Sequence, residues 1–249
     1  MTQALEGRRA ALGDMSPAVA SSLADLGYLA KQQGDWPQVE ARYRAAIPIW
    51  KAAKIDDQEV QSLAEVGFAL VKQEKFDSAE VVLLDVLARR RALYGENHWS
   101  VGDTYEKMAP IAIHRKNFAR AESLSAAGLA SRRSVYGPKS IQAAYQLPNI
   151  AYVFEVRGDT SGAIPSLREA VEILRGLRPE TDPTLIGAER LLTLDLCTPG
   201  YAVEAEDILL NTAATFDHHS AQLLTRRVPS SLLSSLPQEQ QNPAVSTPP

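Results

Sequence analysis

The chain has 249 residues, of which 45% are hydrophobic and 22% charged, a composition typical of a soluble globular protein and not of a chain disordered throughout. Twenty-six Lys and Arg against thirty Asp and Glu give a net charge of −4 without a basic stripe, so we expect no nucleic-acid and no membrane partner. A single cysteine, Cys197, excludes an intramolecular disulfide and argues against Cys-ligated zinc. The segment MTQALEGRRAALGDM is charged where a signal peptide is apolar, and no later stretch is long enough to span a membrane. These features predict a cytoplasmic protein.

A repeat of about 42 residues runs along the chain. The segment AEVVLL at 79–84 recurs as AEDILL at 205–210, and Phe76 is matched by Phe118 one period later. The same period separates four alanines, namely Ala79, Ala121, Ala163 and Ala205. Five units follow from this spacing, with starts near Ser16, Asp57, His98, Lys139 and Asp182.

Each unit has the apolar pattern of two helices joined by a short turn. In the first unit, Leu23, Leu26 and Ala30 recur at helical spacing, and Gly34 ends the helix. A second helical pattern starts at Val39. Small residues share one column of the first helices, as expected where two helix axes approach closely; they are Gly27, Gly67, Ala109 and Ala151.

This pattern resembles the tetratricopeptide repeat, in the variety with longer units found in kinesin light chains. The first unit carries the signature spacing as Leu23, Leu26, Gly27, Ala30, Val39, Tyr43 and Ala46. The AE pairs at 79–80, 121–122 and 205–206 add to the likeness, which covers roughly residues 1–216. The resemblance implies an all-α, right-handed α-solenoid of about five helix-turn-helix repeats. The fifth unit departs from the pattern, because Glu189 replaces a large apolar residue.

Three regions are expected. Residues 1–15 form an N-terminal capping helix, or half repeat, and residues 16–217 form the solenoid. The predicted repeats are 16–56, 57–97, 98–138, 139–181 and 182–217. Residues 218–249 are a Pro/Ser/Gln-rich tail with too little apolar periodicity to repay ordering, so we expect disorder there.

No motif in the sequence predicts catalysis. There is no GxSxG, Walker or GxGxxG motif. The four histidines lack the i, i+4 partners of a helical zinc site; they are His98, His114, His218 and His219. We therefore expect no enzyme activity, no cofactor, no metal and no small-molecule substrate. The run RRR at 89–91 is interpreted as a solvated outer face in preference to a phosphate site.

One constellation suggests binding. In the family that the chain resembles, the first helices line a concave groove. Carrying those positions over gives one row of Tyr28, Phe68, Pro110, Tyr152 and Leu194. The candidate peptide-binding residues are Tyr28, Phe68 and Tyr152 as aromatic anchors, with Asn149, Lys72, Lys107 and Glu65 in flanking rows. Packing of the aromatic rings between adjacent first helices is an equally weighted alternative. Ala24 and Tyr28 stand where chaperone-binding repeats grip a carboxylate with Lys and Asn, which argues against a chaperone C-terminal motif as the ligand.

The favoured function is a non-enzymatic scaffold or adaptor that binds a protein or peptide segment in the groove. Because such arrays are often attached to signalling enzymes, a detached regulatory or sensor module of a system such as a protein kinase is the alternative. An enzyme with an unrecognised site is the least favoured alternative.

Overall fold

Ten α-helices and no strand make up residues 2–196, the part that the structure, a computed structural model, describes. The all-α prediction is confirmed. The helices are α1 (Thr2–Leu12), α2 (Pro17–Gln32), α3 (Trp36–Ala52), α4 (Asp56–Lys72), α5 (Phe76–Tyr94), α6 (Trp99–His114), α7 (Phe118–Tyr136), α8 (Ile141–Arg157), α9 (Thr160–Leu177) and α10 (Pro183–Leu196).

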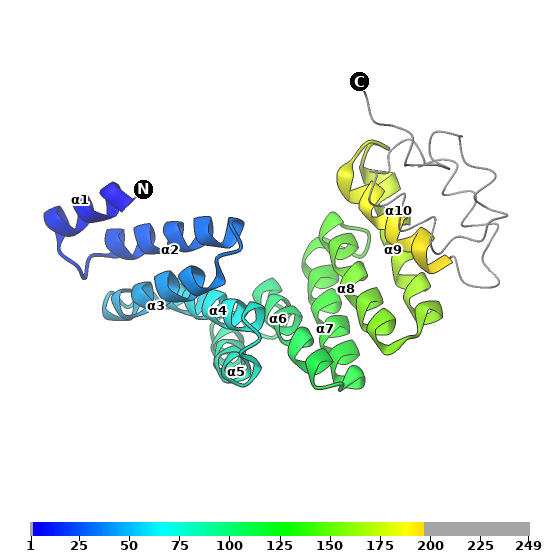
Figure 1. Cartoon of the computed structure of the whole chain (residues 1–249), viewed down its shortest axis with the longest axis horizontal. Coiled ribbons are helices and arrows are strands. Elements are labelled where there is room, and N and C mark those ends of the chain that lie inside the picture. Colours follow the sequence, from blue (N-terminus) through cyan, green and yellow to red (C-terminus); the bar gives the residue numbers. More distant parts are fainter. Residues whose placement is uncertain (1, 197–249) are drawn as a thin grey trace, which may run out of the picture. The chain divides into compact units, whose positions relative to one another are not determined.

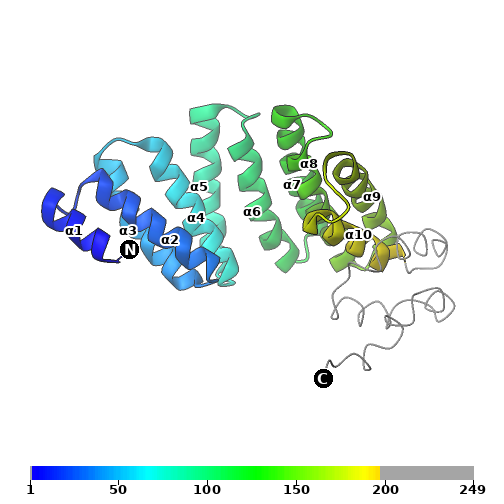
Figure 2. The same cartoon turned by 90° about the horizontal axis from the view of Figure 1, so that it is seen from above.

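The chain divides into two compact units, Met1–Ser131 and Arg132–Pro249, with the boundary inside α7. In the first unit, each helix from α1 to α6 packs against the next, and α4 also contacts α6 (Figures 1 and 2). In the second unit, α9 packs against both α8 and α10. Even-numbered helices from α2 to α10 begin beside the predicted starts of the five units. They are called first helices below, and α3, α5, α7 and α9 are called second helices.

The turns inside the repeats share one backbone conformation. Gly34 and Gly158 have φ values of 72° and 85°, the left-handed region that glycine enters without steric cost. The residues at the same place in the second and third units are Glu74 and Lys116, with φ values of 59° and 55°. A left-handed residue therefore ends every first helix from α2 to α8, and in two of the four units it is not glycine.

The small residues of the first helices face the second helix of their own unit. A Cβ atom added to Gly27 would lie 2.7 Å from Cε2 of Tyr43, and one added to Gly67 would lie 2.6 Å from Cδ2 of Leu83. Both distances are too short for a carbon–carbon contact. The prediction that this column marks a close approach is confirmed at these two positions.

The main core of the first unit lies between α2 and α6. Its central residues come from both kinds of helix, and include Val39, Val66, Leu70, Leu83, Val101 and Met108. A second cluster joins α1 to the first repeat, because Leu5 is 1% exposed and packs with Leu23 and Trp50. The α1 helix thus covers apolar surface of α2 and α3. The division of the chain into cap, solenoid and tail stays a prediction.

Within residues 2–196 the repeated alanine column is completely buried. Ala79, Ala121 and Ala163 are each 0% exposed. We expect Ala121→Leu to destabilise the chain by about 1–3 kcal/mol, because three further carbons must enter a close-packed site. Urea unfolding followed by circular dichroism measures this change. The matched control is Ala130→Leu on the exposed side of the same helix; equal effects of the two substitutions would contradict the assigned repeat positions.

Glu189 of α10, which departs from the repeat pattern, forms an ion pair with a residue of α9. Glu189 is 4% exposed, and its Oε1 atom accepts a hydrogen bond of 2.8 Å from Nε of Arg175 on α9. An ion pair between the buried Glu189 and the half-exposed Arg175 therefore replaces the apolar contact expected there. The second half of the fifth unit, Cys197, His218, His219 and the tail lie outside the described residues.

Candidate functional site

The predicted row on the first helices is exposed to different degrees. The rings of Tyr28 and Tyr152 are on the surface, with 55% and 53% of each residue exposed. Pro110 is exposed, while Phe68 and Leu194 are half-buried. Tyr28 on α2 and Phe68 on α4 belong to the first unit, and Tyr152 on α8 belongs to the second.

Phe68 is in contact with other side chains of the first unit. Its ring meets the ring of Trp36 edge-on, with centroids 5.5 Å apart. Three ammonium groups surround the Phe68 ring, with Nζ to ring-centre distances of 5.0 Å for Lys31, 5.4 Å for Lys72 and 5.5 Å for Lys107. We call these five residues the Phe68 cluster. The Phe68 ring thus packs against a ring of the second helix α3 and lies beside lysine ammonium groups of the first helices α2, α4 and α6.

Two of the three lysines form ion pairs. Lys31 Nζ donates to Glu65 Oε2 at 2.7 Å, and Lys107 Nζ donates to Asp103 Oδ1 at 2.6 Å. Glu65, predicted as a flanking polar residue, is only 6% exposed and is the acceptor in the ion pair with Lys31. Lys72 is exposed, and its ammonium has no carboxylate within ion-pairing distance among residues 2–196.

The Asp103 carboxylate also binds a buried arginine. Arg90 is 1% exposed, and its Nη1 atom donates to Asp103 Oδ2 at 2.8 Å and to the Ser100 carbonyl at 2.6 Å. Burial raises the pKa of Asp103, but Lys107 and Arg90 outweigh burial and hold that pKa below its ordinary value. The carboxylate is therefore ionised at neutral pH.

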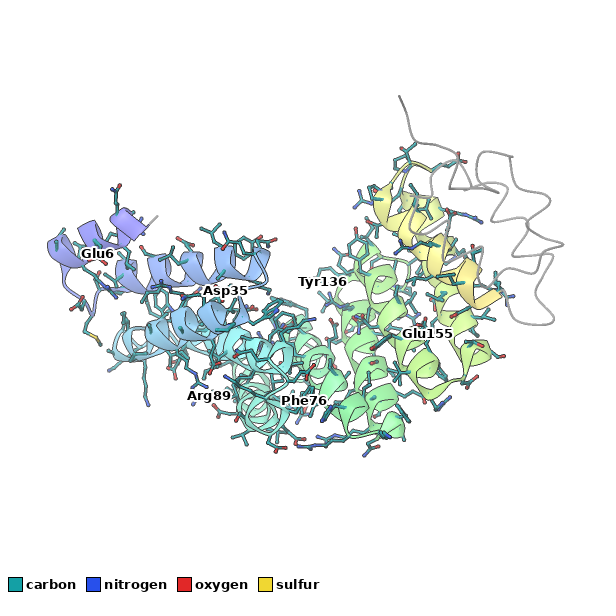
Figure 3. The ribbon with its side chains drawn as sticks, in the orientation of Figure 1. Glu6, Asp35, Phe76, Arg89, Tyr136 and Glu155 are labelled. Atoms are coloured by element: carbon teal, nitrogen blue, oxygen red, sulfur yellow. The ribbon has the colours of Figure 1, made fainter. Side chains whose placement is uncertain are left out.

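The prediction of a solvated face for RRR at 89–91 is wrong for Arg90. The other two arginines conform to it, with 42% of the Arg89 and 41% of the Arg91 side chain exposed. Figure 3 labels Arg89 and Phe76, which both belong to α5. Arg90 instead joins three helices, because its Nη2 atom donates to Gln61 Oε1 of α4 at 2.8 Å while Nη1 reaches α6.

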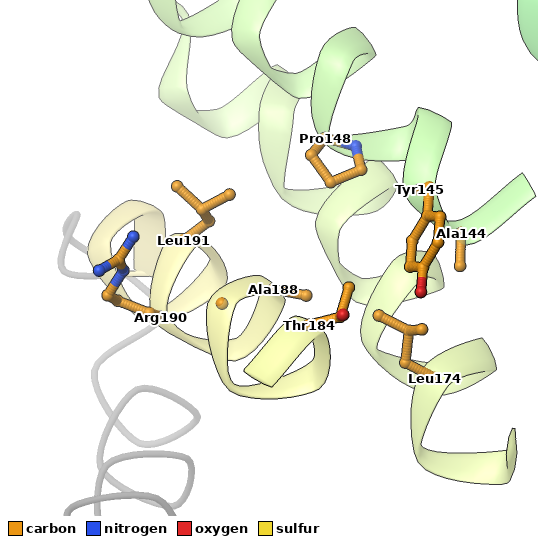
Figure 4. A pocket seen from close by; sticks show the side chains of 9 residues that line it. Ala144, Tyr145, Pro148, Leu174, Thr184, Ala188, Arg190 and Leu191 are labelled. Atoms are coloured by element: carbon orange, nitrogen blue, oxygen red, sulfur yellow. The ribbon is translucent and has the colours of Figure 1, made fainter. Parts of the chain in front are cut away.

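The second unit offers a different surface. Asn149, the predicted polar partner of Tyr152, is exposed, and its Nδ2 atom donates to Gln146 Oε1 at 3.0 Å. An open, largely apolar pocket of about 410 Å³ lies against α8, α9 and α10 (Figure 4). Its lining residues are Ala144, Tyr145, Pro148, Leu174, Thr184, Gly187, Ala188, Arg190 and Leu191. The sequence analysis did not predict this pocket. The signal for it is the small residues that line it, Ala144, Gly187 and Ala188, because they leave space between the helices.

The described histidines have structural roles. The His98 ring caps α6 by accepting a hydrogen bond from the Ser100 amide at 3.3 Å, and it stacks on Tyr94 at 4.5 Å. The His114 ring stacks on Phe76 at 4.0 Å. Across residues 2–196 no three His, Cys, Asp or Glu side chains are grouped to hold a metal ion. Within the same residues, no helix has the length and apolar character to cross a bilayer.

Comparison with known proteins agrees with this architecture. The family model of the tetratricopeptide repeat matches residues 60–100, which include all of α5. The nearly identical TPR-like repeats of a Podosopora anserina protein described as a kinesin light chain superimpose with a TM-score of 0.64 at 17% identity, covering 80% of this chain and 95% of that one. The chain has the tetratricopeptide-repeat fold. BtubC (BKLC) from P. vanneervenii is similar at a TM-score of 0.66 and 17% identity, covering 89% of this chain and 87% of that one. No curated protein matches the sequence.

The AE pair of this tetratricopeptide fold links consecutive repeats. Glu80 on α5 accepts hydrogen bonds from Arg115, just after α6, and from Arg120 on α7. Burial raises the pKa of Glu80, but these two arginines outweigh burial and lower it. Glu40, at the equivalent place on α3, binds Gln73 at 2.9 Å and Lys75 at 3.2 Å. The acidic residue after the buried Val39 or Ala79 therefore ties a second helix to the end of the next first helix.

Proposed function

We propose that the chain is a non-enzymatic scaffold that binds a peptide segment of a partner protein on the surface of its first helices. The observation that carries the proposal is the exposure of two equivalent tyrosine rings, Tyr28 at 55% and Tyr152 at 53%. Large aromatic rings supply much of the binding energy of protein interfaces when a partner buries them. The two rings occupy equivalent positions in two repeats. A shared role in binding explains why both are exposed, an explanation that does not apply to isolated surface residues.

The polar residues support the same proposal. In the first unit Lys72 lies beside the Phe68 ring, and in the second unit Asn149 is exposed one helical turn before Tyr152. Peptide backbones and polar side chains need such donors when a segment lies across an apolar strip. Within this proposal the groove of the family is the binding surface, the five repeats 16–217 carry it, and the protein acts in the cytoplasm.

The proposal predicts that Tyr28→Ala and Tyr152→Ala weaken partner binding without unfolding the chain. We expect each to cost about 2 kcal/mol of binding free energy, roughly thirtyfold in affinity, if its ring contacts the partner. The cost in folding should stay below about 1 kcal/mol, since both rings are already exposed. The measurement is recovery of a partner with the natural chain, followed by titration of the purified partner against each variant.

Tyr136→Ala is the matched control. Tyr136 is 43% exposed and lies at the end of α7, a second helix. This variant should bind the partner as the natural chain does. Unchanged affinity for both first-helix variants, or equal losses in all three, would overturn the proposal.

A further inference from the structure

We infer that the Phe68 cluster is a subsite for a phosphate ester, carried on a phosphorylated serine or threonine of the bound peptide. The inference deepens the proposed function, because it assigns a chemistry to one part of the peptide-binding surface. The observation behind it is the convergence of Lys31, Lys72 and Lys107 on one half-buried ring. All five residues of the cluster belong to the first unit.

The charges at the cluster do not balance. Its three ammonium groups and the Arg90 guanidinium, which shares Asp103 with Lys107, make four positive charges, and their carboxylate partners Glu65 and Asp103 supply two negative ones. Glu65 is taken by Lys31, while Asp103 is shared between Arg90 and Lys107. Two positive charges are therefore left over, close to Lys107 and Lys72.

Glu40, an acidic side chain near the cluster, is already paired. Gln73, next to Lys72, bonds to Glu40, and Glu40 also pairs with Arg44 at 2.9 Å and Lys75 at 3.2 Å. Lys72 is exposed, whereas the Lys107 side chain is 11% exposed and the Lys31 side chain 29% exposed. A ligand would therefore meet the Lys72 ammonium first, with the other two charges behind it.

A phosphate monoester matches this site in charge. It carries about −1.5 to −2 at pH 7, close to the surplus of two, whereas one carboxylate would neutralise only half of that surplus. The Phe68 and Trp36 rings exclude water from one side of the Lys72 ammonium, which lies 5.4 Å and 5.8 Å from their centres. Electrostatic attraction is stronger where water is excluded, so an anion seated there gains more than at an open surface.

The rest of the chain makes the cluster distinctive. The net charge of the whole protein is −4, so a dianion is repelled on average by its surface. A local surplus of positive charge on the predicted binding surface can thus select a phosphorylated segment over an unphosphorylated one. Selectivity of this kind depends on ionic strength, because added salt screens exposed charges.

The test uses the full chain and three fluorescent peptide libraries of equal length, which differ only at a fixed central position that holds phosphoserine, serine or glutamate. Binding is measured by fluorescence anisotropy. We expect the phosphoserine library to bind at least tenfold more tightly than the serine library, with glutamate in between. Lys72→Met should lower the affinity for the phosphoserine library at least tenfold more than it lowers the affinity for the serine library. Lys51→Met, which removes an exposed lysine near the end of α3 outside the cluster, should change neither.

Several outcomes would overturn the inference. Equal binding of the phosphoserine and serine libraries would do so, and so would a phosphoserine preference that survives Lys72→Met. Glutamate binding as tightly as phosphoserine would assign an acidic peptide instead. Inorganic phosphate competing as strongly as the phosphopeptide would show an anion site that does not select peptides. If Tyr28→Ala weakens binding of the serine library, but phosphorylation of the peptide does not change its affinity, this inference alone is contradicted. The proposed scaffold function is then still supported.

Discussion

Arg90→Ala should destabilise the protein by about 3–5 kcal/mol, the range found when one partner of a buried ion pair is removed. The substitution leaves the Asp103 carboxylate with Lys107 alone and removes the donors to Gln61 and to the Ser100 carbonyl. It also opens a cavity, because the Arg90 side chain is among the largest that are fully buried. Urea unfolding followed by circular dichroism measures the loss.

Arg91→Ala is the control for this prediction. Arg91 is the next residue on α5, its side chain is 41% exposed, and its carboxylate partner Glu96 is exposed as well. Exposed pairs contribute about 1 kcal/mol or less, so this variant should unfold close to the natural protein. Similar losses for the two variants would mean that Arg90 does not hold α4, α5 and α6 together.

Phe76→Ala should cost on the order of 3 kcal/mol of folding free energy, the lower end of the range for Phe to Ala substitutions in a core. The ring is half-buried against the main core of the first unit and stacks on His114 of α6 at 4.0 Å. His114 belongs to the first helix of the next unit. Phe76 therefore joins two repeats, and stability in such arrays depends on the interfaces between neighbours.

Val81→Ala on the same helix is the matched control, because Val81 is 70% exposed and should be near neutral. Phe76→Leu should recover most of the lost stability by refilling the space. A neutral Phe76→Ala would contradict the repeat positions assigned to α5 and α6. Thermal melts of the natural chain and the three variants, with midpoints compared at equal concentration, should rank their stabilities in the same order.

Much of the fold could be predicted from the sequence because each repeat obeys the same local rules. Apolar spacing located both helices of a repeat, and the small column at Gly27 and Gly67 identified the face where they meet. The turn after each first helix was only partly predicted. Gly34 indicates a left-handed residue, but Glu74 and Lys116 adopt the same φ without the glycine that makes such positions recognisable.

The buried arginine shows where interpretation by residue type failed. A run of three arginines suggested a solvated face, since charged side chains are rarely buried unless paired. Helical spacing indicated otherwise, because Arg90 follows Leu83 and Leu87 at the interval of one helix face, and both leucines are buried. Its partners, Gln61 and Asp103, lie far from it in sequence, so their proximity depends on how the repeats stack.

The repeat positions of the candidate residues could be predicted from the sequence, but their surroundings could not. Repeat equivalence put Tyr28 and Tyr152 in one row, and both are exposed. The surroundings of Phe68 depend on three separate helices, since Lys31, Lys72 and Lys107 come from α2, α4 and α6. No spacing within one helix could indicate that these ammonium groups share one ring.

The claim that the first helices bind a peptide is tested most directly by photo-crosslinking. A peptide selected from a random library on the immobilised chain would carry a benzophenone at successive positions, and mass spectrometry would identify the attached residues. The account predicts attachment on the first helices, beside Tyr28 and Phe68 on α2 and α4 or beside Tyr152 on α8. Attachment confined to α3, α5, α7 and α9, or to residues beyond Leu196, would contradict it.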